Sequence, residues 1–485
     1  MGSDVYDLIV IGGGPAGVSG ALGAALFGKR VALVEREARL GGAGINTGTV
    51  PSKALRESAL VIAGWRSRKL LGVDLTLKRD ASVRDFTHHE ARVRGTIAGQ
   101  WEERAAMLGV TRVRGQAAFD GPHAIRVTHA DGEPTLLHGT FVLIASGSSP
   151  LRPETFCFDH PRVHDSNQIL QIVELPKKLA VIGAGVVGAE YAGTFAALGV
   201  EVHLIDGRDG LLTFLDHDVS EAIASAMRRM GVQFHWNEKV VACRAPQQGD
   251  VVLELESGRE LAVTDVLVAA GRSSNTAELN LAAAGIVAGR RGLIEVNSFG
   301  QSAVPHVYAA GDVTGPPALA GTGMEQARIA VCHAFGLLGK SMSPLLPTGI
   351  YTIPEASMVG LTEQGARDAG VDYLVGRAPY RGNARGQLIG DESGFLKLIF
   401  RRADMRLLGV HAVGEQATEL VHVGLIAMMC EGDADLFNRA CFNYPTLGDL
   451  YKYAAYDAIL QRMGHAPLDI GELDVREPSE TTKVA

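Results

Sequence analysis

The sequence has no long apolar run and no excess of basic residues. None of its apolar stretches approaches the roughly 18 residues that a membrane-spanning helix needs, so we expect no membrane partner. The formal net charge of -8, with both signs mixed along the chain, gives no basic surface for nucleic acid. The apolar run near the N-terminus has no basic residues before it and is predicted to be a strand rather than a signal peptide. These absences favour a cytoplasmic protein.

Cysteine is also scarce. The chain has five cysteines, an odd number, and none is spaced from another as in a CxxC metal motif. The histidines, including the pair His88 and His89, show no ligand spacing, so we predict no metal site. A chain without a disulfide framework is suited to a reducing compartment. The cysteines are Cys157, Cys243, Cys332, Cys430 and Cys441.

Glycine, by contrast, is abundant, with 59 residues. Residues 5–35 are predicted to form a strand, a glycine turn, a helix and a second strand, which together make a βαβ unit. Gly12, Gly14 and Gly17 form GxGxxG in the turn, and Glu35 ends the second strand. In such a unit the glycines permit the turn and a close approach to a pyrophosphate, and the acid binds a ribose. The pattern therefore predicts a dinucleotide site.

The same pattern occurs again at residues 178–206, where Asp206 ends the second strand. Asp206 would accept hydrogen bonds from a ribose 2′-OH, which favours NAD(H). Arg208 could pair with a 2′-phosphate, which favours NADP(H), or it could be a solvated loop arginine. The sequence therefore leaves the choice between NAD and NADP open. The second GxGxxG consists of Gly183, Gly185 and Gly188.

The length of 485 residues fits about three domains. We predict an α/β protein with two Rossmann-like dinucleotide-binding domains and a C-terminal α+β domain. The second nucleotide-binding domain should be inserted in the first, because another nucleotide-associated segment, HVYAAGDV (306–313), follows it. Residues 54–108 are predicted to be mostly helical and residues 110–145 to form short strands. In the C-terminal part, predicted strands are 385–390, 394–400 and 407–414, and predicted helices are 417–430 and 447–463.

Six motifs follow one another along the chain: GGGPAG (12–17), GGAGINTGTVPSK (41–53), IASGSSP (144–150), GAGVVGAE (183–190), AAGRSSN (269–275) and VYAAGDV (307–313). Their order, from about residue 5 to residue 465, resembles that of the pyridine nucleotide-disulfide oxidoreductases. Within that family, four further segments are similar to the soluble, Si-specific pyridine nucleotide transhydrogenases. These segments are HPRVHDSNQIL (160–170), PTGIYTIPE (347–355), VGRAPYRGNARGQLIG (375–390) and FNYPTLGDLYKYAA (442–455).

The resemblance implies FAD as the bound cofactor, NAD(P)H as an exchangeable substrate, and a homodimer or a higher oligomer. It also implies names for the domains. Residues 1–150 and 276–345 would bind FAD, 151–275 would bind NAD(P), and 346–465 would form the dimerisation domain. The polar tail, 466–485, is predicted to be disordered.

Individual residues acquire roles by the same resemblance. Lys53 would lie beside the flavin N5, where a cation stabilises the anionic flavin, and Glu190 would orient it. The alternatives are a surface lysine on a helix and, for Glu190, a partner of the helix dipole. The implied cofactor-binding residues are Gly12, Gly14, Gly17, Glu35, Arg36, Gly42, Lys53, Ser146, Gly147, Asp312, Ala320, Gly183, Gly185, Gly188, Asp206, Arg208 and Gly271.

Relatives that reduce disulfides carry two redox cysteines and a His-Pro-Thr-x-x-Glu motif. Here Gly44 and Thr49 occupy the cysteine positions, while Tyr444 and Asp449 occupy those of the histidine and the glutamate. A phenol titrates near pH ~10, far above an imidazole, so Tyr444 is poorly suited to move protons to a thiolate. The two losses together predict that no disulfide is reduced. Soluble transhydrogenases often keep the first cysteine, so Gly44 departs from that pattern too.

Two further positions allow two interpretations each. Val186 stands where some relatives place an aromatic gate over the flavin, so it could leave the nicotinamide pocket open or simply pack in its helix. Cys441 lies three residues before Tyr444 and could approach the partner's flavin as a replacement thiol. A buried structural cysteine is the commoner state and is the expectation for Cys441.

The predicted function is ping-pong hydride transfer between NADPH and NAD+, or between NADH and NADP+. Its candidate catalytic residues are Lys53, Glu190, Tyr444 and Asp449. Such a reaction needs no acid or base, because no proton moves to the acceptor, and it depends on positioning and flavin electrostatics. One alternative is an NAD(P)H dehydrogenase that reduces a quinone or another non-thiol acceptor beside Gly44 and Thr49. A second is a non-enzymatic flavin or nucleotide redox sensor that acts through partners.

Overall fold

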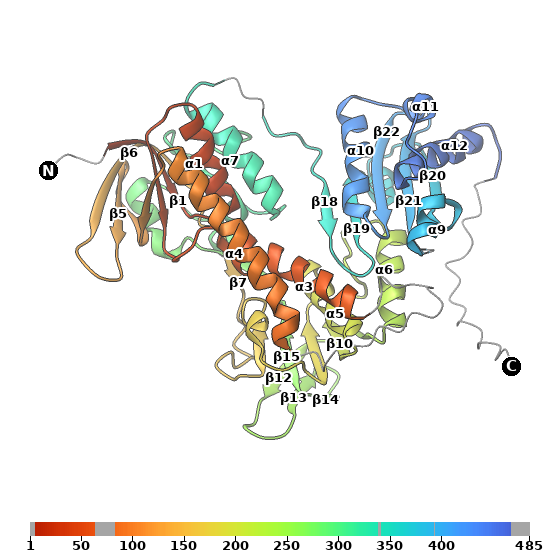
Figure 1. Ribbon diagram of the computed structural model, residues 1–485, viewed down its shortest axis with the longest axis horizontal. Helices are drawn as coiled ribbons and strands as arrows, with labels where there is room; N and C mark the ends of the chain where they lie inside the picture. The colour runs from red at the N-terminus through yellow and green to blue at the C-terminus, as the bar shows by residue number, and fades with distance from the viewer. Residues whose placement is uncertain (1–4, 64–82, 338–340, 392, 467–485) are drawn as a thin grey trace.

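A computed structural model describes residues 5–63, 83–337, 341–391 and 393–466, and these form three parts, each built on a β-sheet (Figure 1). In the view of Figure 1 the first part lies on the left, the second at the bottom and the C-terminal part on the right. This mixed α/β architecture confirms the predicted fold class. Among the described residues, no helix combines the length and the apolar character that crossing a membrane requires. The tail predicted to be disordered falls mainly in 467–485, outside the described residues.

The first part is built on a seven-stranded sheet whose central strand β1 (Val5–Ile11) pairs in parallel with β2 and β6. Strand β17 (Val307–Ala309) pairs with β6 although the second sheet lies between them in the sequence. Both faces of β1 are buried, as in a parallel sheet covered on both sides. The remaining elements are β2 Val31–Glu35, β3 Thr111–Arg114, β4 Gln116–Gly121, β5 Ala124–Thr128, β6 Thr135–Ile144, α1 Pro15–Leu26, α2 Gly42–Asn46, α3 Thr49–Ile62, α4 Val83–Met107 and α7 Ala320–Ala334.

Helices α3 and α4 confirm the helical prediction for the described residues of 54–108, and β3 to β6 confirm the short strands predicted for 110–145. Helix α3 lies near the centre of Figure 1, close to the second part. It packs against α4 and against α5 of the second part. Side chains on α3 can therefore meet residues of another domain.

The second part has a five-stranded parallel sheet in the order β11, β10, β9, β15, β8. A three-stranded antiparallel sheet packs beside it, and the short pair β7 and β16 connects the first two parts. The elements are β7 Ser148–Pro150, β8 Val163–Asp165, β9 Lys178–Ile182, α5 Val186–Ala197, β10 Glu201–Asp206, α6 His217–Arg229, β11 Gln233–Trp236, β12 Val240–Arg244, β13 Val251–Leu255, β14 Glu260–Val263, β15 Asp265–Val268 and β16 Arg272–Ser274.

The C-terminal part is an antiparallel sheet in the order β18, β19, β22, β21, β20, with helices packed on it. The predicted strand at 385–390 is wrong, because these residues form most of helix α9. The side chain of Asn383 accepts hydrogen bonds from the backbone N–H groups of Arg385 and Gly386 and so starts the helix. The elements are β18 Thr348–Ile350, β19 Ala356–Gly360, α8 Glu363–Asp368, β20 Tyr373–Pro379, α9 Ala384–Ile389, β21 Phe395–Arg401, β22 Leu407–Val413, α10 Ala417–Met429, α11 Ala434–Arg439 and α12 Leu450–Arg462.

Candidate functional site

The first glycine turn lies between β1 and α1, where the backbone comes close to itself. Gly12 has φ +104°, and a Cβ there would overlap the carbonyl oxygen of Ala145 at the end of β6. A Cβ at Gly17 would overlap the carbonyl oxygen of Gly12. Both positions therefore require glycine. Since no side chain of the described residues caps α1, its first N–H groups remain available to a phosphate.

Helix α2 brings a second stretch of bare backbone to the same place. Gly42 has φ +49°, and a Cβ there would lie 2.8 Å from the Cα of Gly14. Two segments far apart in the sequence thus meet without side chains between them. This arrangement matches the close backbone approach that a pyrophosphate requires.

Glu35 ends β2 and is buried, and its carboxylate organises the turn. Its Oε2 accepts a hydrogen bond from the backbone N–H of Gly13 at 2.6 Å, and its Oε1 accepts one from Glu37 at 2.8 Å. Arg36 points to the surface, 3.7 Å from Glu278. The sequence indicated the position of Glu35 but not its bonds to the backbone of the glycine turn.

A cleft of about 280 Å³ opens beside Glu35. It is lined by Gly12, Glu35, Arg36 and Ser146, among others. The hydroxyl oxygen of Ser146 is buried and has no hydrogen-bond partner among the described residues. A buried polar atom without a partner is costly, so a ligand that supplies one is expected here. The cleft and the glycine cradle together fit the adenosine and pyrophosphate of FAD.

Residues of the first and second parts meet around Asp312. Its carboxylate accepts a hydrogen bond from the Ser148 hydroxyl at 2.5 Å and lies 3.9 Å from Nε of Arg272. Burial lowers the pKa of Arg272 below its usual value. Three more predicted residues lie at chain turns or a helix start near these elements: Gly147 (φ +68°), Gly271 (φ +112°) and Ala320, the first residue of α7.

Lys53 of α3 and Glu190 of α5 form an ion pair between the first and second parts. Their Nζ and Oε2 atoms are 2.6 Å apart, and their side chains are 24% and 6% exposed. The other oxygen of Glu190 accepts a hydrogen bond from the backbone N–H of Tyr351 at 3.0 Å. The ring of Tyr351 lies under the ammonium, 5.0 Å from its centroid. The pairing predicted for Lys53 and Glu190 is present. Tyr351 was not identified from the sequence as a site residue, because the segment 347–355 was used there only as evidence for the family resemblance.

The second glycine turn has the geometry of the first. Gly183 has φ +106°, with Ala269 oxygen 2.6 Å from a Cβ position, and a Cβ at Gly188 would overlap the Gly183 oxygen. At Gly185, the second glycine of the motif, a Cβ would meet nothing within 4 Å among the described residues. No side chain of the described residues therefore covers the N-terminus of α5 at Gly185.

Asp206 occupies in this turn the place that Glu35 occupies in the first. Its Oδ2 accepts a hydrogen bond from Ala184 N at 2.6 Å. Arg208 folds onto the same carboxylate, with Nε 2.9 Å from Oδ1 and Nη2 2.8 Å from Oδ2. Burial would raise the pKa of Asp206, but the hydrogen bonds from Arg208 and Ala184 outweigh it and lower the pKa. Arg208 is thus not a free loop arginine.

The first thiol position leaves no room for a side chain. A Cβ at Gly44 of α2 would lie 2.5 Å from Cγ of Pro15, so the proline ring occupies the direction in which a cysteine would project. Thr49 is the first residue of α3. The remaining cysteines are free, and Cys441 is exposed, so the expectation of a buried structural cysteine at 441 is wrong.

The other two candidate catalytic residues lie in the C-terminal part. Tyr444 is 78% exposed and makes no hydrogen bond or ion pair with residues in the described ranges. Asp449 ends the short 3₁₀ helix Leu447–Asp449 that precedes α12. Neither residue contacts the Lys53–Glu190 pair within the described chain. Val186 packs against the core under α5, in agreement with its helix-packing interpretation.

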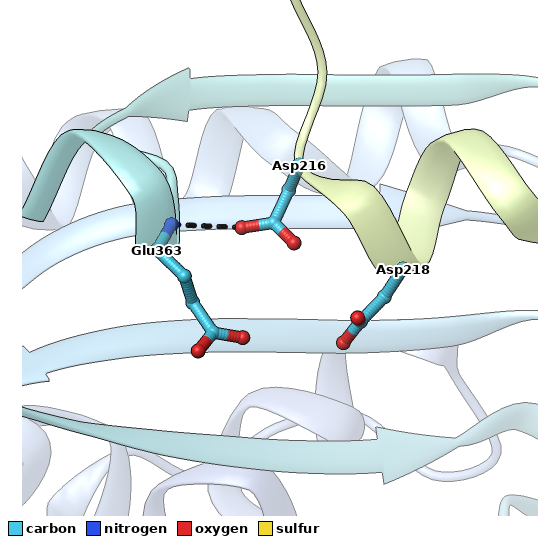
Figure 2. A group of neighbouring side chains, drawn as sticks. All are labelled: Asp216, Asp218 and Glu363. Atoms are coloured by element: carbon cyan, nitrogen blue, oxygen red, sulfur yellow. Dashed lines mark hydrogen bonds between the residues drawn. The ribbon is translucent and has the colours of Figure 1, made fainter. Parts of the chain in front are cut away.

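A further acidic cluster joins α6 to the C-terminal part (Figure 2). Asp216 and Asp218 point toward Glu363 of α8, and Asp216 accepts a hydrogen bond from the backbone N–H of Glu363 at 2.9 Å. The three carboxylates surround the ammonium of Lys397, which is fully buried and lies 2.7 Å from Asp216 and 2.9 Å from Asp218. Arg377 adds a second cation, 2.8 Å from Asp218. The space that a metal ion would need is therefore taken by Lys397, and we assign the cluster a structural role between domains.

Two glycine turns with their acids, a cradle that fits FAD, and an ion pair between them define a flavoprotein with a second site for a nicotinamide nucleotide. Residues 6–334 match the family described as "Pyridine nucleotide-disulphide oxidoreductase". Residues 346–455 match the dimerisation domain of the same family. The chain belongs to this family, which confirms the resemblance. Members of the family bind FAD and use NAD(P)H as substrate.

Proteins with similar sequences match nearly the whole chain. It is 42% identical over 455 residues to the soluble pyridine nucleotide transhydrogenase of Mycobacterium bovis, covering 94% of this chain and 97% of that protein. It is 38% identical to the soluble pyridine nucleotide transhydrogenase of Colwellia psychrerythraea, covering 94% and 98%.

Solved structures agree in fold. LpdA from Mycobacterium tuberculosis has a TM-score of 0.86 at 26% identity, covering 93% of this chain and 99% of that chain. The HOCl-induced flavoprotein disulfide reductase RclA from Escherichia coli has a TM-score of 0.83 at 27% identity, covering 92% and 99%.

Proposed function

We propose that this chain transfers hydride between NADPH and NAD+, or between NADH and NADP+, through FAD and without a redox disulfide. The observation that carries the proposal is the Lys53–Glu190 ion pair at the flavin cradle, retained where Gly44 and Thr49 replace the thiols. The 38–42% identity to soluble transhydrogenases supports the same reaction.

Each part of the site has a place in this reaction. The backbone at Gly12, Gly14 and Gly42 would hold the pyrophosphate of FAD, and Ser146 and Glu35 would bind near its adenosine. Bound FAD would supply a two-electron carrier between one nucleotide and the next. Lys53 would place a positive charge at the flavin, and Glu190 would keep that charge in position.

Nucleotide choice would depend on Asp206 and Arg208. A transhydrogenase has to accept NAD(H) and NADP(H) in turn at one site. Asp206 would accept the 2′-OH of NAD(H). Arg208, already held beside it, would turn toward the 2′-phosphate of NADP(H) and exchange one charged partner for another. We therefore propose that both nucleotides are used.

The C-terminal part would form a homodimer. Apolar and aromatic side chains are exposed on α10, on α12 and next to the ends of α12, and they include Ile426, Met429, Tyr444, Tyr453 and Met463. Exposed apolar surface of this kind marks an interaction site, and the match to a dimerisation domain indicates a second copy as the partner. In the dimer, Tyr444 and Asp449 would lie near the flavin of the partner subunit. We place the protein in the cytoplasm.

The alternative with a quinone acceptor gains no support at Gly44, because Pro15 fills the space beside it. One experiment separates the two reactions. The protein is titrated anaerobically with NADPH until the flavin absorbance is bleached, and then a thionicotinamide analogue of NAD+ or a quinone is added. We expect the absorbance to return rapidly with the analogue. Rapid return with the quinone alone would overturn the transhydrogenase proposal.

A further inference from the structure

The Lys53–Glu190 pair is in contact with a residue of the third part of the molecule. Tyr351 follows β18 in the C-terminal part, and it touches both members of the pair. Its backbone N–H donates to Oε1 of Glu190 at 3.0 Å, while Oε2 of the same carboxylate receives the Lys53 ammonium at 2.6 Å. The carboxylate is thus held from both sides, and its orientation depends on where Tyr351 lies.

The ring of Tyr351 adds a second contact. The Lys53 ammonium lies 5.0 Å from the ring centroid, within the range of a cation–π interaction. Burial raises the pKa of Tyr351 above its usual value, so the ring is a neutral phenol at working pH. A neutral ring attracts the ammonium without accepting its proton. With Glu190 and the ring as two neighbours, the 24% exposed ammonium can face the cofactor.

Tyr351 is itself held in place by the C-terminal part. Its hydroxyl interacts with Thr418, the second residue of α10. The Thr418 hydroxyl donates to Oε2 of the buried Glu355 at 2.6 Å. The neighbouring residue Thr352 accepts a hydrogen bond from Nε of the buried Arg56, one turn beyond Lys53 on α3, at 2.9 Å. The segment at 351–352 is therefore fixed to α3, α5 and α10 together.

We propose that Tyr351 is a positioning residue for hydride transfer: through its backbone N–H and its ring, the C-terminal part sets the place of the Lys53–Glu190 pair at the flavin. The proposal rests on the proposed function in one respect, that Lys53 acts at the flavin. Tyr351 does not react itself. It limits the directions in which the ammonium can move, and a looser ammonium stabilises the developing charge less well.

The test compares Tyr351→Leu, which removes the ring, with Tyr351→Phe, which keeps it. Loss of a partly buried cation–π contact should slow bleaching of the flavin by NADPH about threefold to thirtyfold in stopped flow. Tyr351→Phe should restore most of the rate. Phe335→Leu is the matched control, because it removes a similar contact with Lys29 (4.8 Å) elsewhere in the FAD-binding part and should leave the rate unchanged.

A second readout does not depend on turnover. Acetic anhydride labels exposed amines, and mass spectrometry should find Lys53 labelled faster in Tyr351→Leu than in the wild type, while Lys29 is labelled equally. The reduction potential of the flavin should also shift in Tyr351→Leu and not in Tyr351→Phe. If Tyr351→Leu loses FAD, Tyr351→Met also removes the ring but has a longer, flexible side chain that can fill part of the space, and it serves in its place.

The proposal would be overturned if, in Tyr351→Leu or Tyr351→Met, the flavin is bleached and Lys53 is labelled at the wild-type rates. So would a Tyr351→Phe variant as slow as Tyr351→Leu, because the hydroxyl would then matter and not the ring. These measurements use only the step with NADPH. A failure of the thionicotinamide analogue to restore the absorbance would therefore count against transhydrogenation and leave the Tyr351 result interpretable.

Discussion

Replacing Gly44 with alanine should destabilise the protein, because Pro15 already occupies the space into which a Cβ would project. The added atom would lie 2.5 Å from Cγ and 3.1 Å from Cδ of Pro15. Carbon atoms in contact normally lie about 3.5–4.0 Å apart, so one side must move by about 1 Å. Pro15 is at the start of α1, and its ring cannot rotate away. Overpacking of this kind costs about 1–3 kcal/mol of unfolding free energy.

The same movement should weaken FAD binding. Helix α2 carries both Gly44 and Gly42, and Gly42 faces the backbone of Gly14 in the cradle. If α2 moves away from Pro15, the two stretches of backbone separate. We expect a lower free energy of unfolding in denaturant and a weaker FAD affinity in flavin fluorescence titrations. The same clash should hinder Gly44→Cys, so restoring this cysteine should not restore a working thiol pair.

Gly23→Ala is the matched control, since it lies in α1 and its added Cβ meets nothing within 4 Å among the described residues. Alanine in a helix interior should stabilise this variant by about 0.5–1 kcal/mol. A Gly44→Ala protein as stable as the wild type, with unchanged FAD affinity, would refute the packing argument.

Three further predictions concern charged residues. Lys53→Met should slow bleaching of the flavin by NADPH about 10²-fold or more, while FAD affinity measured by titration changes much less. Arg208→Leu should raise the KM for NADPH about tenfold or more and leave that for NADH nearly unchanged in steady-state assays. Asp218 has its pKa lowered from 3.8 to about 2, because hydrogen bonds from Arg377 and Lys397 outweigh the effect of burial. Its contribution to stability should be complete above its usual pKa and disappear as pH falls through about 2, as acid unfolding of wild type and Asp218→Asn would show.

Each of these predictions has a result that contradicts it. If NADPH bleaches the flavin of Lys53→Met at the wild-type rate, Lys53 has no role in the reaction. For Arg208, the control is Arg228→Leu, an arginine in the same part with equal exposure, 47%, and equal KM changes for both variants would show a general charge effect. If the difference in unfolding free energy between wild type and Asp218→Asn stays constant down to pH 2, the ion pairs of Asp218 with Arg377 and Lys397 do not stabilise the fold.

Local sequence patterns were sufficient for the elements whose physics is local. The two GxGxxG turns could be predicted because part of their geometry is local: a Cβ at Gly17 would overlap the carbonyl oxygen of Gly12, only five residues earlier. The acids Glu35 and Asp206 could be placed because a βαβ unit has a regular spacing. The helix at 384–389 could not be predicted, since it is only six residues long and its start depends on the side chain of Asn383.

The sequence by itself determined which groups are present: two dinucleotide turns, a lysine and a glutamate in family motifs, and no thiol pair beside the flavin cradle. Only the tertiary structure decided how they are combined. It brought Tyr351 to Glu190 across 161 positions of sequence, turned Arg208 onto Asp206, placed Lys397 among three carboxylates, and packed Gly44 on Pro15. The reason is physical: chain spacing controls contacts within a turn or a strand pair, whereas contacts between domains depend on the packing of whole sheets and helices.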